Sequence, residues 1–107
     1  MPLFNLKGYN MQIKLLLGDE EKTFTAGRPK GRAVREAIAL ANKMDPKKIN
    51  GEVFDELIDF TVDVYGKQFT RDDVYDGLYA DEILQEMTKT VSTIAGGTSK
   101  KLETKNE

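Results

Sequence analysis

The chain has 107 residues, of which 39% are hydrophobic and 32% are charged, and its 18 acidic and 16 basic side chains leave a net charge of −2. This length and mixture are typical of one globular domain, and no apolar run approaches the ~20 residues of a membrane-spanning helix. The absence of cysteine and histidine excludes disulfides, thiol nucleophiles and zinc–thiolate sites, and it removes the usual general base of enzymes. We therefore expect a binding protein without catalytic residues or a cofactor, not an enzyme.

The start of the chain predicts a leader arm over residues 1–10 and then a single α+β domain over residues 11–97; either Met1 or Met11 begins the folded unit. The segments Gln12–Leu17 and Lys22–Ala26 alternate in side-chain character, and turn-forming residues at 18–21 lie between them. This pattern predicts a β-hairpin. Because a two-stranded hairpin is marginally stable by itself, we expect helices to cover one of its faces.

Two amphipathic helices are expected after a basic connector at residues 27–31. The first runs from about Arg32 to Met44, and the proline that follows Asp45 ends it. Its apolar side chains recur at helical spacing: Val34, Ala37, Ile38, Ala41 and Met44. The second runs over residues 52–65, with apolar side chains on one face and acidic ones on the other, and Gly66 ends it in a left-handed conformation.

Two further helices are expected in the last third of the chain. Thr70 and Asp73 are spaced as a capping box at the start of a short helix, and Asp81 is the expected cap of the last one. Six apolar side chains form the stripe of that helix: Ile83, Leu84, Met87, Val91, Ile94 and Ala95. Gly96–Gly97 is expected to end it, followed by a flexible tail over residues 98–107. The predicted fold class is therefore α+β, with an N-terminal β-hairpin packed against a bundle of about three to four helices and a loose C-terminal tail.

Charge is segregated along the chain. Residues 22–48 carry eight basic and two acidic side chains, whereas residues 51–86 carry eleven acidic and two basic ones. The two segments either face each other within the fold, or they steer association with a partner or with a second copy of the chain. A homo-oligomer of the second kind should weaken with salt. The dense part of the basic segment is a patch of four cations: Arg28, Lys30, Arg32 and Arg35.

Acidic side chains recur at i, i+4 and i+8 on the second helix, at Asp55, Asp59 and Asp63. This spacing is compatible with a hard-cation site or with the water-facing side of an amphipathic helix; we favour the second and expect no metal site. The basic patch could contact phosphates, but no nucleic-acid-binding motif accompanies it. A would-be recognition helix starting at Thr70 is acidic where DNA contacts would fall. We therefore expect neither nucleic acid nor a membrane as a partner.

Six short segments together carry a resemblance to a known family: Met11–Leu15 (MQIKL), Glu21–Thr25 (EKTFT), Gly31–Ala37 (GRAVREA), Phe54–Phe60 (FDELIDF), Val64–Thr70 (VYGKQFT) and Asp72–Gly77 (DDVYDG). They resemble the small tail assembly chaperones of long-tailed phages and prophages of Gram-positive bacteria, over about residues 11–97. The resemblance implies a protein that binds the tape measure protein in the host bacterial cytoplasm. It also implies that this protein keeps the hydrophobic helices of its partner soluble before the tail tube polymerises and is absent from the mature virion.

The resemblance also implies a second partner, because in many relatives a frameshifted, longer form recruits the tail tube protein. A chaperone of this kind needs exposed apolar side chains. The candidates lie beside the main helix stripe or in the short segments after it: Phe60, Val62, Phe69, Val74, Tyr75, Leu78 and Tyr79. Ordinary core packing is the alternative for each of them. Two other functions stay open, a structural virion protein (a minor tail or head–tail connector subunit) and a small DNA-binding regulator.

Overall fold

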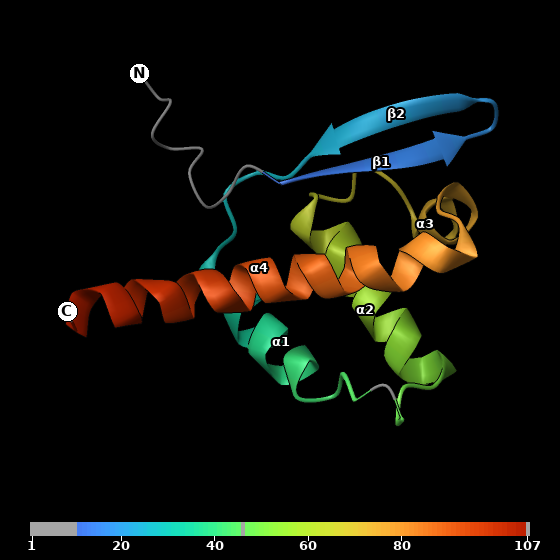
Figure 1. Ribbon diagram of the computed structural model, residues 1–107. Helices are drawn as coiled ribbons and strands as arrows, with labels where there is room; N and C mark the ends of the chain where they lie inside the picture. Colours follow the sequence, from blue (N-terminus) through green and yellow to red (C-terminus); the bar gives the residue numbers. More distant parts are fainter. Residues whose placement is uncertain (1–10, 46, 107) are drawn as a thin grey trace, which may run out of the picture.

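The computed structural model describes residues 11–45 and 47–106, so the predicted leader arm at residues 1–10 lies outside the described residues. Two strands are followed by four helices: β1 (Gln12–Leu17), β2 (Glu20–Thr25), α1 (Gly31–Ala41), α2 (Gly51–Val64), α3 (Arg71–Gly77) and α4 (Ala80–Asn106). The hairpin lies over one side of the helices, and α4 runs across the whole fold (Figure 1). This arrangement confirms the predicted α+β class with an N-terminal hairpin on a helical bundle.

The hairpin is tighter than the sequence pattern predicts. Its ladder runs from the pair Gln12–Thr25 to the pair Leu17–Glu20, so the loop holds only two residues instead of the expected four. Gly18, the first loop residue, has a φ of 66°, a conformation that favours glycine and that a two-residue hairpin turn needs. The inner face of β1 is buried through Ile13 and Leu15, whereas β2 is exposed except for the half-buried Phe24.

Helix α1 is shorter than expected and buries a different face. It ends at Ala41, not near Met44, and its buried side chains are Ala37 and Leu40. Ile38, which the sequence pattern places on the buried stripe, is 49% exposed. The polar side chains of α1 share one side of the helix, and Ile38 and Leu40 lie at the two edges of the apolar side, so helical spacing alone does not say which edge is buried. Packing against α2 and α4 selects the face that is buried.

Helices α2 and α3 confirm their predicted positions, the Gly66 stop and the capping box of α3, and the structure adds an N-cap for α2 that was not predicted. The Asn50 side chain caps α2 by accepting from the backbone N–H of Val53 at 2.9 Å, and Gly66, with a φ of 71°, follows the end of the helix. At α3, Thr70 Oγ1 accepts from the backbone N–H of Asp73 at 3.1 Å, while Asp73 Oδ2 accepts from the Thr70 N–H at 2.9 Å. The predicted capping box is therefore present, and it starts a helix of only seven residues.

Helix α4 departs from the sequence prediction at both ends. It begins at Ala80, so Asp81 lies in the first turn and is not the cap. It also continues through Gly96–Gly97, where the sequence pattern predicts a stop. Gly96 lacks the positive φ of a left-handed C-cap, and glycine weakens a helix interior by about 1 kcal/mol without blocking it. The last part of α4 projects beyond the other helices (Figure 1). Flexibility of residues 98–107 in solution stays a prediction.

The core forms where α4 crosses α2 under the hairpin. Five side chains of α4 are buried at helical spacing: Ile83, Met87, Thr90, Val91 and Ile94. They face α1 and α2. The buried hydroxyl of Thr61 donates to the Leu57 carbonyl at 3.0 Å and lies 3.1 Å from the sulfur of Met87, so this polar group inside the core has partners. In the part of the chain that the structure describes, no helix is long and apolar enough to span a membrane.

Candidate protein-binding surfaces

Three of the seven candidate contact residues lie in the core. Phe60 and Phe69 are each 4% exposed, and Val74 is fully buried. The ring of Phe69 packs edge-on against Phe24, with 4.9 Å between the ring centroids, and is tilted against Tyr65 at 5.6 Å. Core packing therefore accounts for all three side chains. A partner would reach Phe69 or Val74 only by displacing neighbouring side chains.

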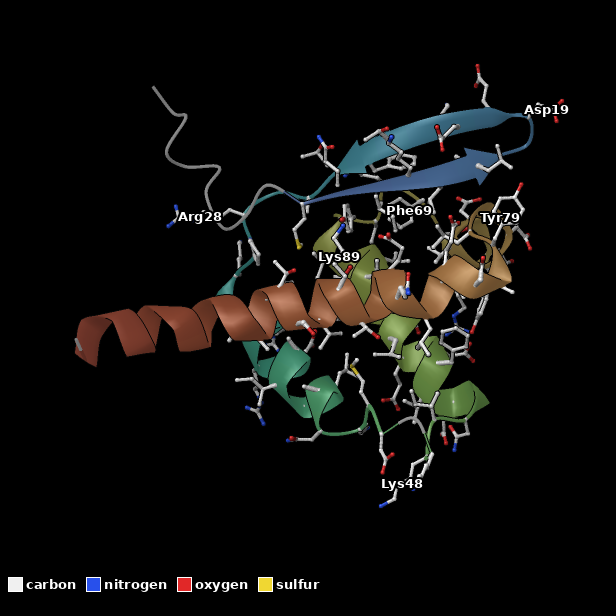
Figure 2. The ribbon with its side chains drawn as sticks, in the orientation of Figure 1. Asp19, Arg28, Lys48, Phe69, Tyr79 and Lys89 are labelled. Carbon is white, nitrogen blue, oxygen red and sulfur yellow. The ribbon has the colours of Figure 1, made fainter. Side chains whose placement is uncertain are left out.

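Of the four remaining candidates, Tyr75 lies on α3, Leu78 and Tyr79 lie where α3 meets α4, and Val62 lies on α2. Val62, Tyr75 and Leu78 are half-buried, and Tyr79 is 66% exposed. Leu84, which the sequence pattern places on the buried stripe of α4, is 40% exposed. We call Leu78, Tyr79 and Leu84 the apolar corner. Tyr79 lies at the junction of the two helices, below the loop end of the hairpin (Figure 2).

Gly77 joins the apolar corner to the hairpin. A Cβ atom added to this glycine would lie 3.0 Å from Leu15 Cβ and 3.2 Å from the backbone nitrogen of Leu16. The end of α3 therefore lies so close to the backbone of β1 that a Cβ atom at this position would require its neighbours to shift. This contact positions Leu78 and Tyr79 beside Leu16, whose side chain is 36% exposed on the outer face of β1. Strand alternation indicates an outward Leu16, but no sequence signal places it next to α3.

A groove of about 760 Å³ leads from the apolar corner along α4. We call it the polar groove, because charged side chains of both signs line it. Its residues come from the hairpin, the α3–α4 junction and α4: Met11, Gln12, Lys14, Glu21, Leu78, Glu82, Gln85, Glu86, Lys89 and Thr93. Lys89 lies between α4 and the hairpin (Figure 2). Leu78 belongs to both the groove and the corner, so the two form one continuous surface.

The aspartates of α2 pair with a cation of the protein itself. Arg71 of α3 donates to both carboxylate oxygens of Asp59, through Nε at 2.9 Å and Nη2 at 2.7 Å, and its Nη1 lies 3.6 Å from Asp55. These hydrogen bonds lower the pKa of Asp59. In the described residues, no group of three or more carboxylates is arranged to hold a metal ion. The aspartates instead attach α3 to α2 and so support the apolar corner.

The hydroxyl of Tyr75 also contacts an aspartate of α2, and its protonation makes the stability of the fold depend on pH. The hydroxyl donates to Asp55 Oδ1. Partial burial, followed by this hydrogen bond and the charge of Asp55, raises the pKa of Tyr75 to about 12. Between about pH 10 and pH 12 the unfolded chain therefore loses the phenol proton while the folded chain keeps it, so the free energy of unfolding falls as pH rises.

Tyr75→Phe is expected to reduce this loss of stability above about pH 10, because phenylalanine does not ionise. The loss should not vanish, because burial also raises the pKa of Tyr65 to about 12. Urea unfolding across this pH range measures the effect, with Asp55→Asn as a second variant that removes the charge near the phenol. Superimposable pH profiles for Tyr75→Phe and the unchanged protein would contradict the prediction.

The basic patch faces solvent. Arg28, Lys30, Arg32 and Arg35 are all exposed, and none of them forms an ion pair with the described residues. One ion pair joins the basic segment to the acidic one, between Lys43 Nζ and Glu56 Oε1 at 2.9 Å. Among the described residues, most of the segregated charge therefore faces solvent.

Three of the four cations surround a second groove, of about 700 Å³, between the start of α1 and the end of α2. Apolar residues line much of it: Pro29, Ala33, Phe60, Val64 and Tyr65. Its cations are Arg28, Lys30, Arg32 and Lys67, and two carboxylates, Glu36 and Asp63, line it as well. We call it the basic groove, because the cations outnumber the carboxylates. The turn at Gly66 and Lys67, with φ values of 71° and 58°, brings in Lys67, which the sequence pattern does not predict there. Arg35 does not line this groove.

Comparison with known proteins identifies a family whose model matches most of the chain. The model of a protein family described as phage tail chaperone protein matches residues 9–107. No curated protein and no solved structure was found to match the chain. The matched range includes both strands, all four helices, the apolar corner and both grooves.

Proposed function

Since the chain belongs to the phage tail chaperone family, we propose that it binds the tape measure protein and keeps it soluble in the host cytoplasm until the tail tube forms. The identity of this partner rests on the resemblance of the sequence to tail assembly chaperones. The observation that carries the binding surface is the exposure of Tyr79, 66%, together with its apolar neighbours in the corner. A protein with this role catalyses no reaction and is absent from the mature tail.

The apolar corner suits the apolar face of an amphipathic helix. Such helices dock through a few anchors spaced three to four residues apart. Tyr79 directly precedes α4, Leu84 lies in the second turn of that helix, and Leu78 extends the surface toward the polar groove. Tyrosine is a frequent anchor in interfaces, because it buries a large ring and keeps a polar hydroxyl. The mixed charges of the polar groove can pair with the polar flanks of the same helix.

The test is co-expression with the tape measure protein, followed by measurement of the soluble fraction and of the affinity of the purified complex. Tyr79→Ala and Leu84→Ala are each expected to weaken binding by about tenfold or more if these residues are central anchors. Ile38→Ala is the matched control, because Ile38 is an apolar side chain on a different helix whose exposure, 49%, lies between those of Leu84 and Tyr79. The control should bind as the unchanged protein does.

Two results would contradict the proposal. The first is a tape measure protein that is no more soluble with this chain than without it. The second is the presence of this chain in purified mature virions at the stoichiometry of a structural subunit, which would favour a minor tail or connector protein. Equal losses of affinity in Ile38→Ala and Tyr79→Ala would leave the chaperone role intact but move the contact away from the apolar corner.

A further inference from the structure

Strand β1 has an edge that faces away from β2. The backbone N–H of Ala26 donates to the Met11 carbonyl at 2.9 Å, so these two residues form a hydrogen-bonded pair at the start of the ladder. Along two antiparallel strands such pairs alternate with pairs whose backbone groups point outward. The register therefore directs the backbone N–H and C=O of every second residue of β1 to its free edge: Gln12, Lys14 and Leu16.

The close approach of Gly77 supports this orientation independently. A Cβ atom on Gly77 would lie 3.2 Å from the nitrogen and 3.3 Å from the oxygen of Leu16, so the end of α3 covers the free edge at this residue. Gln12 and Lys14 remain open. Within residues 11–45 and 47–106, no group donates to or accepts from their backbone N–H and C=O. Unpaired backbone groups on an edge strand form a template for pairing with a further strand.

The polar groove gives this open edge a second wall. Gln12 and Lys14 line the groove, of about 760 Å³, on the side of the hairpin, and α4 lines it on the other side. Lys89 of α4 lies between that helix and the hairpin (Figure 2). An extended segment laid along the edge would therefore meet the backbone of β1 on one side and the side chains of α4 on the other.

The charges of the α4 wall are arranged by sign. Helix α4 runs back along β1 in the opposite direction, so Glu82 and Glu86 lie toward the Leu78 end of the groove and Lys89 lies toward the Met11 end (Figure 1). None of the three charged side chains forms an ion pair with the described residues. A segment with a basic side chain toward Leu78 and an acidic one toward Met11 is complementary to this wall.

We propose that an extended segment of the tape measure protein adds a strand to the free edge of β1 in the polar groove. The segment adjoins the helix that docks on the apolar corner, because Leu78 belongs to both surfaces. This inference rests on the proposed function and adds a second mode of contact to it. In strand addition the backbone hydrogen bonds supply affinity and the side chains beside the strand supply selectivity. Here Glu82, Glu86 and Lys89 have the selective role.

Amide hydrogen exchange, followed by NMR in the full chain alone and in complex with the tape measure protein, tests the pairing. In the free chain the amides of Gln12 and Lys14 should exchange rapidly, whereas those of Ile13 and Leu15 should be protected by the ladder with β2. In the complex the first two amides should exchange at least about tenfold more slowly, because they then donate to the added strand. The amides of Ile13 and Leu15 serve as the internal control.

Lys14→Pro removes one backbone donor from the free edge. Proline has no N–H, and an edge strand tolerates it where that N–H would point away from the ladder. Affinity for the tape measure protein should fall at least about tenfold, because one hydrogen bond is lost and a carbonyl of the partner is left unpaired. Thr23→Pro is the matched control. Thr23 lies directly opposite Lys14, so its N–H points to the outer edge of β2, and this variant should bind as the unchanged protein does.

Lys14→Ala separates the backbone of Lys14 from its charge. It keeps the N–H and should lose less than about fivefold in affinity, since an exposed ion pair contributes little. Protected amides at Ile13 and Leu15 show that the hairpin of each variant is intact. If Lys14→Pro disrupts the hairpin, exchange in the unchanged chain decides the question by itself.

Three outcomes would overturn the proposal. Failure of the tape measure protein to bind would remove both this inference and the proposed function. A stable complex in which Gln12 and Lys14 exchange as fast as in the free chain would remove the added strand alone and leave the chaperone role intact. Protection of both amides in the free chain would mean that the edge is already paired, and so closed to a partner.

Discussion

Replacing Met87 by alanine is expected to lower the free energy of unfolding by about 2–5 kcal/mol. Met87 is fully buried where α4 crosses α2, and its sulfur lies 3.1 Å from the hydroxyl of Thr61. Truncation removes buried apolar area, leaves a cavity in a small core and deprives Thr61 of one of its two contacts. The Thr61 hydroxyl keeps its bond to the Leu57 carbonyl, so a buried unpaired donor does not add to the loss.

Urea unfolding measures this effect, and Leu84→Ala on the same helix is its matched control. Leu84 is 40% exposed. Its replacement is expected to change the free energy of unfolding by no more than about 0.5 kcal/mol, while it weakens partner binding. Equal destabilisation by the two substitutions would mean that α4 turns a different face to the core than the one described.

Replacing Gly77 by alanine is expected to cost about 1–3 kcal/mol, the usual penalty for forcing atoms into a packed interior. The added Cβ would lie 3.0 Å from Leu15 Cβ and 3.2 Å from the Leu16 nitrogen, so it meets the backbone of β1 and not a flexible side-chain end. Either the hairpin or the end of α3 must move. Because Leu78 and Tyr79 follow directly, the same substitution should also lower affinity for the tail partner.

Gly96→Ala provides the control for Gly77→Ala. Gly96 lies inside α4, has no atom within 4 Å of an added Cβ and has no positive φ. Alanine there should raise the free energy of unfolding by about 0.4–1 kcal/mol, because it restricts the unfolded chain and favours the helix. Thermal and urea unfolding of both variants test the pair. A stabilising Gly77→Ala would show that α3 does not press on β1, and a destabilising Gly96→Ala would argue that α4 ends near this residue.

Elements with local signals could be predicted from the sequence. The hairpin follows from alternation in residues 12–17 and 22–26, and α2 follows from an apolar stripe opposed by acidic side chains. The start of α3 follows from the spacing of Thr70 and Asp73, because both hydrogen bonds of a capping box form within four residues. Each of these patterns lies within one short segment, so it can be recognised without knowing which distant residues contact that segment.

Helix faces and ends were harder to predict. In α1, Leu40 and Ile38 lie at opposite edges of the apolar side, and packing against α2 and α4 leaves Leu40 buried and Ile38 exposed. In α4 the glycine pair is a typical stop signal, yet the helix continues through it. Glycine supplies the freedom to end a helix, but the neighbouring residues must also adopt the turn.

By itself, the sequence determined a small α+β domain with segregated charge and a resemblance to phage tail chaperones. Only the tertiary structure decided which apolar side chains face solvent: Phe69 and Val74 are core, and Tyr79 is exposed. It also decided that Lys67 joins Arg28 beside one groove, and that Gly77 touches a strand about sixty residues earlier in the chain. The physical reason is the same in each case. Burial and groove formation depend on contacts between elements far apart in sequence, and periodicity within one element indicates an apolar face without saying which other elements cover it.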